Sequence, residues 1–243
     1  MRDPIAETSP STRGRILAVL YLLVILGGII AQLFISDRFV VRNDAATTAA
    51  NIVANRSLYR LAFTIFMLEM AAQVAVSMLF YDLLKPVNRS VARLSAIFGL
   101  TASGIKTMAR VFFYAPLILL SGAPYLSGVM TTAQVEALAF VFLRINSQGA
   151  AIALIFFGFE TVLRGWLVFK SGFLPRFLGV ISMIGGLGWL TYLWPPLGSQ
   201  LFMGIALFAI VGVFATAGWL FVRGVDDAKW RERAALATAS IWR

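Results

Sequence analysis

Long runs of hydrophobic residues, separated by short polar segments, dominate the pattern along this chain. A helix needs roughly 20 consecutive apolar residues to cross the hydrocarbon core of a membrane. Runs that approach or exceed this length predict six transmembrane helices, over residues 16–35, 61–84, 93–120, 148–169, 177–194 and 201–222. The expected fold class is all-α, a polytopic membrane helix bundle. The expected organisation is an N-terminal tail over residues 1–14, one transmembrane domain over 15–223 and a C-terminal tail over 224–243.

Three polar segments between or beyond these spans also have helical patterns. Asp44 precedes AATTAANIVAN and is a good N-cap, because its carboxylate can accept a hydrogen bond from a first-turn N–H group. Ile52 and Val53 give this segment an apolar face, which predicts a short interfacial helix after the first span. Residues 132–145 are expected to be helical and either to extend the fourth span or to lie along the membrane surface. The C-terminal tail is expected to be a helix bound to the surface through Trp230 and its arginines.

The composition agrees with a membrane protein and excludes several kinds of chemistry. Of the 243 residues, 60% are hydrophobic and only 13% are charged, whereas a soluble domain has roughly 25% charged residues. Cysteine and histidine are both absent. Disulfides, haem ligation, a histidine zinc site and a Ser-His-Asp triad are therefore excluded, and we expect no cofactor and no metal. The net charge of +10 does not indicate nucleic-acid binding, because no basic surface domain is present to carry it.

Basic residues are concentrated on one side of the predicted spans. That side, which holds both termini, carries Arg13, Arg15, Lys85, Arg89, Arg93, Lys170, Arg176, Arg223, Lys229, Arg231 and Arg233. The opposite side carries Arg38, Arg42, Arg56 and Arg60 in one segment, and its other two loops are almost uncharged. Because cytoplasmic loops of membrane proteins are enriched in Lys and Arg, this distribution predicts cytoplasmic N- and C-termini.

Charged residues also occur within the predicted spans, where each isolated charge costs roughly 2.5–3.5 kcal/mol on insertion scales. A helix rises about 1.5 Å per residue, so the depth of each charge follows from its distance to the cytoplasmic end. Glu69 lies roughly 24 Å, Lys106 roughly 20 Å and Glu160 roughly 15 Å from that end. Because charges inside a membrane almost always face the bundle interior and pair, three helices are expected to build one buried polar cluster.

Spacing and depth together suggest which residues meet. In three spans two polar residues are four positions apart and share a helix face: Glu69 with Gln73, Lys106 with Arg110, and Glu160 with Arg164. Depth matching pairs Glu69 with Arg110 and Glu160 with Lys106, while Arg164 can also pair with Glu160 along its own helix or reach the headgroups. The candidate ligand-binding residues are Gln32, Glu69, Gln73, Lys106, Arg110, Glu160 and Arg164. Because basic groups outnumber acidic ones in this set, the expected ligand is anionic.

Two further groups of residues have structural as well as functional interpretations. Arg144, Asn146, Ser147 and Gln148 either form a polar mouth at the outer end of the fourth span or are an ordinary interfacial helix end. Gly99, Gly185, Gly186, Gly188 and Gly212 lie where helices are expected to touch. They are interpreted as packing glycines, because small residues allow close approach of helix backbones.

Several segments resemble a known family. NDAATTAANIVANRSLYRLAF and KSGFLPRFLGVISMIGGLGWL, with RILAVLYLLVILGGIIAQLFI and LLKPVNRSVARLSAIFGL, are similar to the bacterial integral-membrane family called domain of unknown function 4386. The resemblance runs from about Arg13 to Val225. It implies a bacterial inner-membrane protein with six helices and implies no activity. Relatives carry histidines in the fourth span where this chain has Asn146 and Glu160, so histidine-based metal or haem chemistry is not expected here.

Three functions fit these observations. The leading hypothesis is a non-enzymatic, multi-pass inner-membrane protein whose buried charged cavity binds or conducts a small anionic solute. The second is a membrane subunit in which the charges only hold helices together, and the partner is lipid, a second copy in a homodimer or another membrane protein. The third is a lipid-modifying enzyme in which Glu69 or Glu160 acts as a general base. A hydrated path to the cluster would favour the first, and a dry, fully paired cluster would favour the second.

Overall fold

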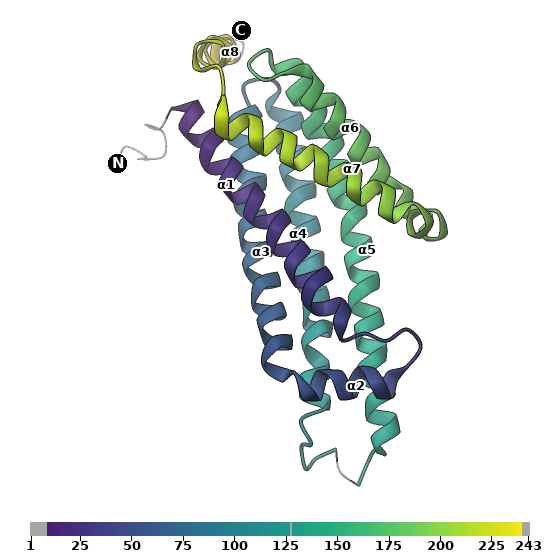
Figure 1. Cartoon of the computed structure of the whole chain (residues 1–243). Helices are drawn as coiled ribbons and strands as arrows, with labels where there is room; N and C mark the ends of the chain where they lie inside the picture. The colour runs from purple at the N-terminus through teal and green to yellow at the C-terminus, as the bar shows by residue number, and fades with distance from the viewer. Residues whose placement is uncertain (1–8, 127, 240–243) are drawn as a thin grey trace. The chain divides into compact units, whose positions relative to one another are not determined.

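The computed structural model describes residues 9–126 and 128–239, and within them every regular element is a helix (Figure 1). The α-helices are α1 (Pro10–Ile29), α2 (Ala45–Ala54), α3 (Arg56–Leu84), α4 (Arg89–Leu119), α5 (Thr132–Ser171), α6 (Arg176–Leu190), α7 (Pro195–Val222) and α8 (Asp227–Ala239). Three short elements complete the order: the π-helix η1 (Ile30–Ile35) and the 3-10 helices η2 (Ser36–Arg38) and η3 (Thr191–Leu193). The predicted all-α membrane fold, with a short helix after the first span, is confirmed.

Five helical segments of the described chain are long and apolar enough to cross a membrane, judged by length and composition. They are Pro10–Arg38, Arg56–Leu84, Thr132–Ser171, Arg176–Leu193 and Pro195–Val222, and they coincide with five of the six predicted spans. The remaining predicted span falls on α4, which has 31 residues but carries Arg89, Arg93, Lys106 and Arg110. The segment 132–145 extends the fourth span, because α5 is one continuous helix of 40 residues.

The chain forms two compact units. The boundaries between them fall inside α1, α3, α4 and α5, so each of these helices has one segment in the first unit and one in the second. The first unit contains residues 1–23, 72–102 and 154–243, and the second contains residues 24–71 and 103–153.

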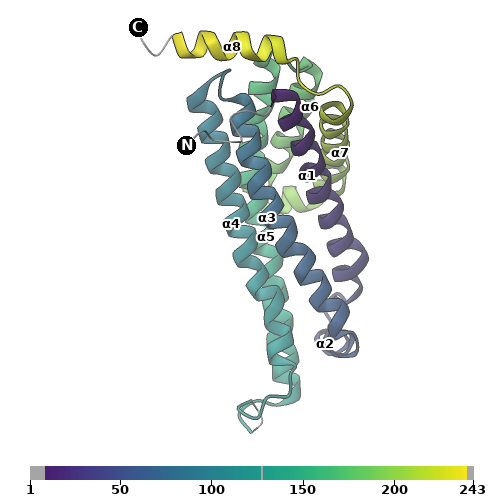
Figure 2. The ribbon, with the colours of Figure 1, turned by 90° about the vertical axis from the view of Figure 1, so that its left-hand side faces the viewer.

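The second unit is built around aromatic side chains between α3 and α4. Tyr59 stacks on Phe113, with 4.4 Å between ring centroids, and its hydroxyl donates a 2.6 Å hydrogen bond to the Phe113 carbonyl. Helix α2 begins where the sequence predicts, because the Asp44 carboxylate accepts a 2.9 Å hydrogen bond from the Thr47 N–H group. It runs crosswise to α3, appearing lengthwise in Figure 1 and end-on in Figure 2. Ile52 of α2 is fully buried in the core cluster of this unit, so α2 covers the core through its apolar face.

Glycines set the contacts between α5 and α6 in the first unit, at Gly186, as the sequence suggested, and also at three glycines that it did not single out: Gly158, Gly165 and Gly179. A Cβ atom added at Gly179 of α6 would lie 2.6 Å from the carbonyl oxygen of Gly165 in α5. One added at Gly186 would lie 2.9 Å from the carbonyl oxygen of Gly158, also in α5. Atoms do not approach this closely without a shift of the backbone, so α5 and α6 pack with their backbones in contact because these positions lack side chains.

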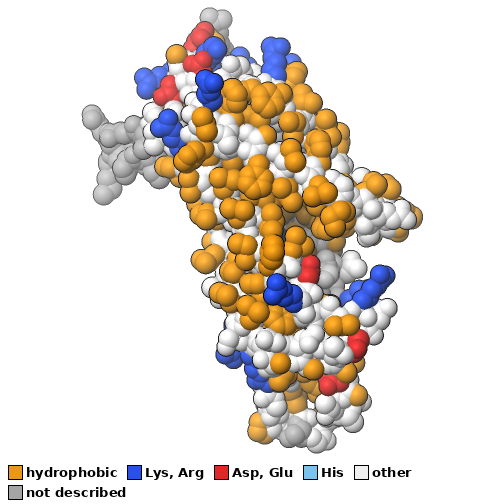
Figure 3. Space-filling model, viewed as in Figure 1, with side chains coloured by type: hydrophobic (Ala, Val, Ile, Leu, Met, Phe, Trp, Pro, Cys, Tyr) orange, Lys and Arg blue, Asp and Glu red, His pale blue; other side chains and the backbone are white. Residues whose placement is uncertain are grey.

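Large apolar side chains are exposed where lipid is expected. On α7, Met203 is 65%, Leu207 58% and Val211 61% exposed. Figure 3 shows hydrophobic side chains covering much of the face that α1 and α7 present to the viewer. Exposed apolar residues over this much of a helix are typical of membrane-spanning segments, which supports the assignment as a multi-pass membrane protein.

Candidate functional site

The buried charges form two clusters, one in each unit, instead of the single cluster predicted. The Glu69 cluster consists of Glu69, Lys106, Arg110 and Asn146 in the second unit, and the Glu160 cluster consists of Tyr21, Ser77, Ser95, Glu160, Thr161 and Arg164 in the first. The predicted pairing of Glu160 with Lys106 was wrong, and Glu69 interacts electrostatically with Arg110 without forming a direct ion pair with it. Glu69 pairs with Lys106, and Glu160 pairs with Arg164 one turn along its own helix, which was the alternative for that residue.

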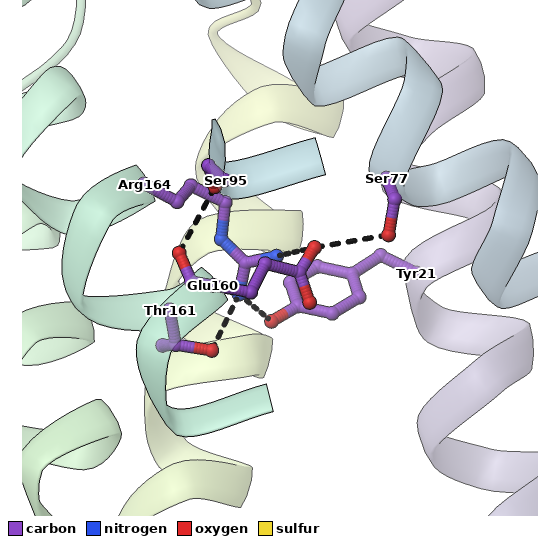
Figure 4. Close-up of polar contacts among 6 residues, drawn as sticks. All are labelled: Tyr21, Ser77, Ser95, Glu160, Thr161 and Arg164. Carbon is purple, nitrogen blue, oxygen red and sulfur yellow. Dashed lines mark hydrogen bonds and ion pairs between the residues drawn. The ribbon is translucent and has the colours of Figure 1, made fainter. Parts of the chain in front are cut away.

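In the Glu160 cluster every charged group has hydrogen-bonding partners (Figure 4). Oε1 of Glu160 accepts a 2.9 Å hydrogen bond from the Ser77 hydroxyl and lies 3.5 Å from Nη1 of Arg164. Nη2 of Arg164 donates to the Tyr21 hydroxyl at 2.9 Å and to the Thr161 hydroxyl at 3.4 Å. Glu160 is 2% and Arg164 5% exposed. Charges withdrawn from solvent to this degree are tolerated only when they are paired and hydrogen-bonded, as these two are.

Gly99 of α4 allows the Glu160 carboxylate to lie against that helix. A Cβ atom at Gly99 would lie 2.6 Å from Cδ and Oε1 of Glu160 and 2.5 Å from the Ser77 hydroxyl oxygen. One turn earlier, the Ser95 hydroxyl donates a 3.0 Å hydrogen bond to the backbone carbonyl of Glu160. The predicted packing role of Gly99 therefore places it beside the buried charge.

Arg164 has little free space around it. Its Cζ atom lies 4.4 Å from the ring centroid of Phe80 and 5.3 Å from that of Tyr21, within cation–π range. The cavity beside it, which Ser182 and Thr216 also line, has a volume of about 10 Å³. That volume accommodates about one water molecule. The Glu160 cluster is thus compact and paired, as expected for an element that fixes the positions of helices.

The Glu69 cluster lies on α3, α4 and α5. Nζ of Lys106 donates a 2.7 Å hydrogen bond to Oε1 of Glu69. Nη1 of Arg110 donates a 3.2 Å hydrogen bond to Oδ1 of Asn146, and its Cζ atom lies 3.4 Å from the ring centroid of Phe66. Glu69 is 6% and Arg110 3% exposed, while 19% of the Lys106 side chain is exposed. Lys106 is therefore the charged member of this cluster that reaches the molecular surface.

Two polar atoms of this cluster have no hydrogen-bonding partner in the described part of the chain. They are Oε2 of Glu69 and Nε of Arg110. None of the ion pairs between described residues includes Arg110. A buried polar atom without a partner costs roughly 1–3 kcal/mol, and more when the group is charged. Such atoms point to a bound water, ion or ligand.

The other predicted site residues are placed differently. Gln32 is exposed within the π-helix η1, and its amide donates a 2.7 Å hydrogen bond to Asp37. Gln73 is 5% exposed, one turn along α3 from Glu69 and in the other unit. Within residues 9–126 and 128–239, no group of three or more acidic, histidine or cysteine side chains could hold a metal ion.

Sequence reasoning missed the neutral members of both clusters. Asn146 was assigned to an interfacial helix end or polar mouth, yet it is 7% exposed and bonded to Arg110. Tyr21, Ser77 and Ser95 were not singled out at all. Serines within spans often bond to their own helix backbone, so their presence alone does not indicate a site. The only signal in the sequence for these three residues is that each lies at about the same depth in its span as a charged residue in another span.

Comparisons with known proteins agree with the family resemblance in the sequence. The family described as "Domain of unknown function (DUF4386)" matches residues 16–224. An uncharacterized protein of Archaeoglobus fulgidus is 26% identical over 164 residues, which are 67% of this chain and 80% of that protein. No solved structure matches the chain. Because the family match covers most of the sequence, this chain belongs to the DUF4386 family, whose function is unknown.

Proposed function

We propose that this protein binds a small anion beside Arg110 in the Glu69 cluster, inside a membrane domain of six spans. The observation that carries the proposal is the state of Arg110. Arg110 is 3% exposed, its Nε atom has no hydrogen-bonding partner in the described part of the chain, and it makes no direct ion pair with a described residue. Its electrostatic partner is Glu69, whose carboxylate is already bound by Lys106, so two buried cations share one anion. A bound anion would balance the second cation.

The balance of charge distinguishes the Glu69 cluster from the Glu160 cluster. The Glu69 cluster contains two cations, Lys106 and Arg110, and one carboxylate. The Glu160 cluster contains one of each, Glu160 and Arg164. A low-dielectric site with an excess positive charge attracts an anion, while a neutral and paired site does not. The second unit is therefore the better candidate for ligand binding.

The geometry favours a small oxyanion as ligand. Arginine binds carboxylate and phosphate oxygens through parallel N–H groups, and the free Nε of Arg110 is one of the donors used in such contacts. The Lys106 side chain is 19% exposed, so an ion that approaches this cluster from the surface would meet Lys106 before the more deeply buried Arg110. Lys106 already binds one oxygen of Glu69, so an arriving anion would share this lysine or displace it from the carboxylate.

A structural role is the second candidate, and it fits the Glu160 cluster. That cluster joins α1, α3, α4 and α5 through the hydrogen bonds of Tyr21, Ser77, Ser95 and Arg164. Its charges are paired, and the cavity beside Arg164 has a volume of only about 10 Å³, while a second cavity lined by Tyr21 and Thr161 has about 60 Å³, enough for a few water molecules. This cluster is proposed to fix the relative register of the four helix segments in the first unit.

Contacts between the start of α1 and the region where α7 ends and α8 begins support the six-span topology. The Ser11 N–H group of α1 donates a 2.8 Å hydrogen bond to Asp227 at the start of α8. A Cβ atom at Gly14 would lie 3.1 Å from Val225 and 3.4 Å from Leu220 at the end of α7. The start of α1 and the end of α7 therefore lie together, which requires an even number of crossings between them. Five spans would separate these ends, so α4 is proposed as the sixth.

The side on which these ends lie follows from charge. Exposed basic residues near helix ends of the first unit are Arg15, Arg89, Arg93, Lys170, Arg176 and Arg223. Under the positive-inside rule they favour a cytoplasmic location for both ends of the chain. The expected location in a bacterial inner membrane remains a proposal, since the curated relative described above comes from an archaeon.

Calorimetric titration of the purified protein in a nonionic detergent tests the proposed site. Inorganic phosphate and acetate serve as the two probes, so that either class of oxyanion can be detected. We expect saturable binding of at least one probe to the wild type, and its loss in Arg110→Gln. Arg60→Gln is the matched control, because Arg60 is an exposed arginine of the same unit. Absence of binding to the wild type, or unchanged binding in a folded Arg110→Gln variant, would overturn the proposal.

A further inference from the structure

Helix α8 lies crosswise to the helices of the unit that contains it. It is seen end-on in Figure 1 and lengthwise in Figure 2, where α3 and α4 run at a large angle to it. It follows α7 after a short connection, in which Gly224 has a φ of 68° and allows a sharp change of direction. A helix of this orientation at the end of a transmembrane segment is aligned with the membrane surface rather than with its normal.

Three backbone and side-chain contacts hold α8 against the first unit. Asp227 accepts the hydrogen bond from Ser11 of α1. The Trp230 indole N–H donates a 2.8 Å hydrogen bond to the carbonyl of Leu83, close to the C-terminal end of α3. Such terminal carbonyls have no partner within their own helix, so this bond completes the end of α3. The N–H group of Asp226, just before α8, donates to the Phe173 carbonyl at 3.4 Å.

Trp230 thus makes a contact within the protein that the sequence did not predict. The sequence suggested that it would anchor the tail in the membrane, yet its polar atom is used by the protein and its side chain is half-buried. The inner face of α8 consists of the half-buried residues Asp227, Trp230, Ala234 and Ala237. Attachment to the membrane must then depend on the residues that flank this face.

On α8, the residues on both sides of the inner face are the basic Arg231 and Arg233, and the charged residue opposite to that face is the acidic Glu232. Each residue turns a helix by about 100°. Arg231 follows Trp230 and Arg233 precedes Ala234, so each lies about 100° from the inner face, on opposite flanks. Glu232 is two positions from both inner residues and therefore points about 200° away, to the outer side. Basic residues beside the inner face and an acid opposite to it form the charge pattern of a helix on an anionic surface.

Arg231 and Arg233 are also free to bind an external anion. Both are exposed, and the ion pairs formed among the described residues include neither of them. Lys229 differs, because its Nζ atom lies 3.0 Å from Asp226. The exposed basic residues near other helix ends of the first unit add to the positive potential of this surface. They are Arg15, Arg89, Arg93, Lys170, Arg176 and Arg223.

We infer that α8 is a lipid-binding element, in which Arg231 and Arg233 bind the phosphates of anionic phospholipid headgroups. The inferred site lies in the first unit and does not depend on the anion site proposed at Arg110. Each arginine near an anionic membrane surface strengthens binding by about fivefold at physiological ionic strength. The interaction is electrostatic, so added salt weakens it within the range set by the Debye length.

Native mass spectrometry of the purified protein, titrated with phosphatidylglycerol or with zwitterionic phosphatidylcholine, tests this inference. We expect the wild type to prefer phosphatidylglycerol, and the variant Arg231→Gln/Arg233→Gln to lose about tenfold or more of that preference. The control variant Arg38→Gln/Arg42→Gln removes two exposed arginines from the other unit and should keep it. Glu232→Gln should keep or strengthen it, because the acid lies on the same helix.

Two results would overturn the inference. One is a wild type that binds both lipids equally. The other is a Arg231→Gln/Arg233→Gln variant that keeps the wild-type preference while its helix content and melting temperature are unchanged. Because all four arginines are exposed, neither double variant removes a core contact, and loss of folding can be recognised separately by circular dichroism.

Discussion

Lys106 of α4 and Glu69 of α3 form a direct ion pair, with 2.7 Å between Nζ and Oε1, while Oε2 of the same carboxylate has no partner in the described part of the chain. The pair joins two neighbouring helices at a point where both carry further polar residues. Gly28 of α1 lies against the carboxylate as well, since a Cβ atom there would be 3.2 Å from Oε1. The lysine is thus the cation in direct contact with Glu69, while Arg110 interacts with the same carboxylate electrostatically.

Removal of this lysine should destabilise the protein. In Lys106→Met the Glu69 carboxylate would remain buried without its cation, which typically costs about 3–5 kcal/mol. We expect a clear decrease in the free energy of unfolding, measured by denaturant titration in detergent micelles. The double variant Lys106→Met/Glu69→Gln removes both charges and should recover most of that loss. If the double variant loses as much free energy of unfolding as the two single variants lose together, the contact between Lys106 and Glu69 does not stabilise the protein.

Two glycines of α4 provide a matched comparison of packing beside the Glu160 cluster. Gly99→Ala would place a methyl group 2.6 Å from the Glu160 carboxylate, whereas a Cβ atom at Gly104 meets nothing within 4 Å. Overpacking typically costs about 1–3 kcal/mol, while Gly→Ala at an open helical position stabilises by about 0.5–1 kcal/mol. Melting temperatures of the two variants should therefore move in opposite directions. Equal melting temperatures would contradict the close approach of Glu160 to α4.

The cap of α2 predicts a dependence on pH. Hydrogen bonds from the hydroxyl and backbone N–H of Thr47 lower the pKa of Asp44 below its ordinary value of 3.8. Because the folded pKa lies below the unfolded one, the charged cap stabilises α2 above the unfolded pKa, and this contribution is lost as pH falls through the folded pKa.

Asp44→Asn separates the charge of this cap from its hydrogen bond. Asparagine is also a good N-cap but does not titrate. The melting temperature of the wild type should fall relative to that of Asp44→Asn when the pH is lowered from about 6 to about 3. A constant difference over that range would show that the Asp44 charge does not support α2.

The crossing of α4 can be tested by reporter fusions on either side of it. Asn88 precedes α4 and Pro124 follows it. Reporters that are active only in the cytoplasm should give signal after Asn88 and none after Pro124. Cytoplasmic signal from both positions would mean that α4 does not cross and that the six-span topology is wrong.

Most of the fold could be predicted from the sequence because membrane spans have a simple signature. Length and apolar composition located five spans, and Asp44 located the start of α2. Residues 132–145 were ambiguous, because their polar side chains fit both a surface helix and an extension of α5. Of the glycines at contacts between α5 and α6, Gly186 was recognised, since close backbone approach needs small residues, whereas Gly158, Gly165 and Gly179 were not.

The pairing of the buried charges could not be predicted, for a geometric reason. Depth along a helix axis placed Glu69 and Lys106 about 4 Å apart, which is less than one helical turn of about 5.4 Å. A difference of that size cannot decide between neighbouring partners such as Lys106 and Arg110. The faces that the helices present to one another decide it, and the sequence of a single chain does not contain that information.

Anomalous diffraction from crystals grown or soaked in bromide can locate an anion bound beside Arg110. Bromide is a small anion that can be located by its anomalous signal at the position it occupies. We expect a bromide peak within hydrogen-bonding distance of Nε of Arg110, and no peak beside Arg164, whose guanidinium is already bound by Glu160, Tyr21 and Thr161. Bromide peaks at surface arginines with none at Arg110 would contradict the proposed site.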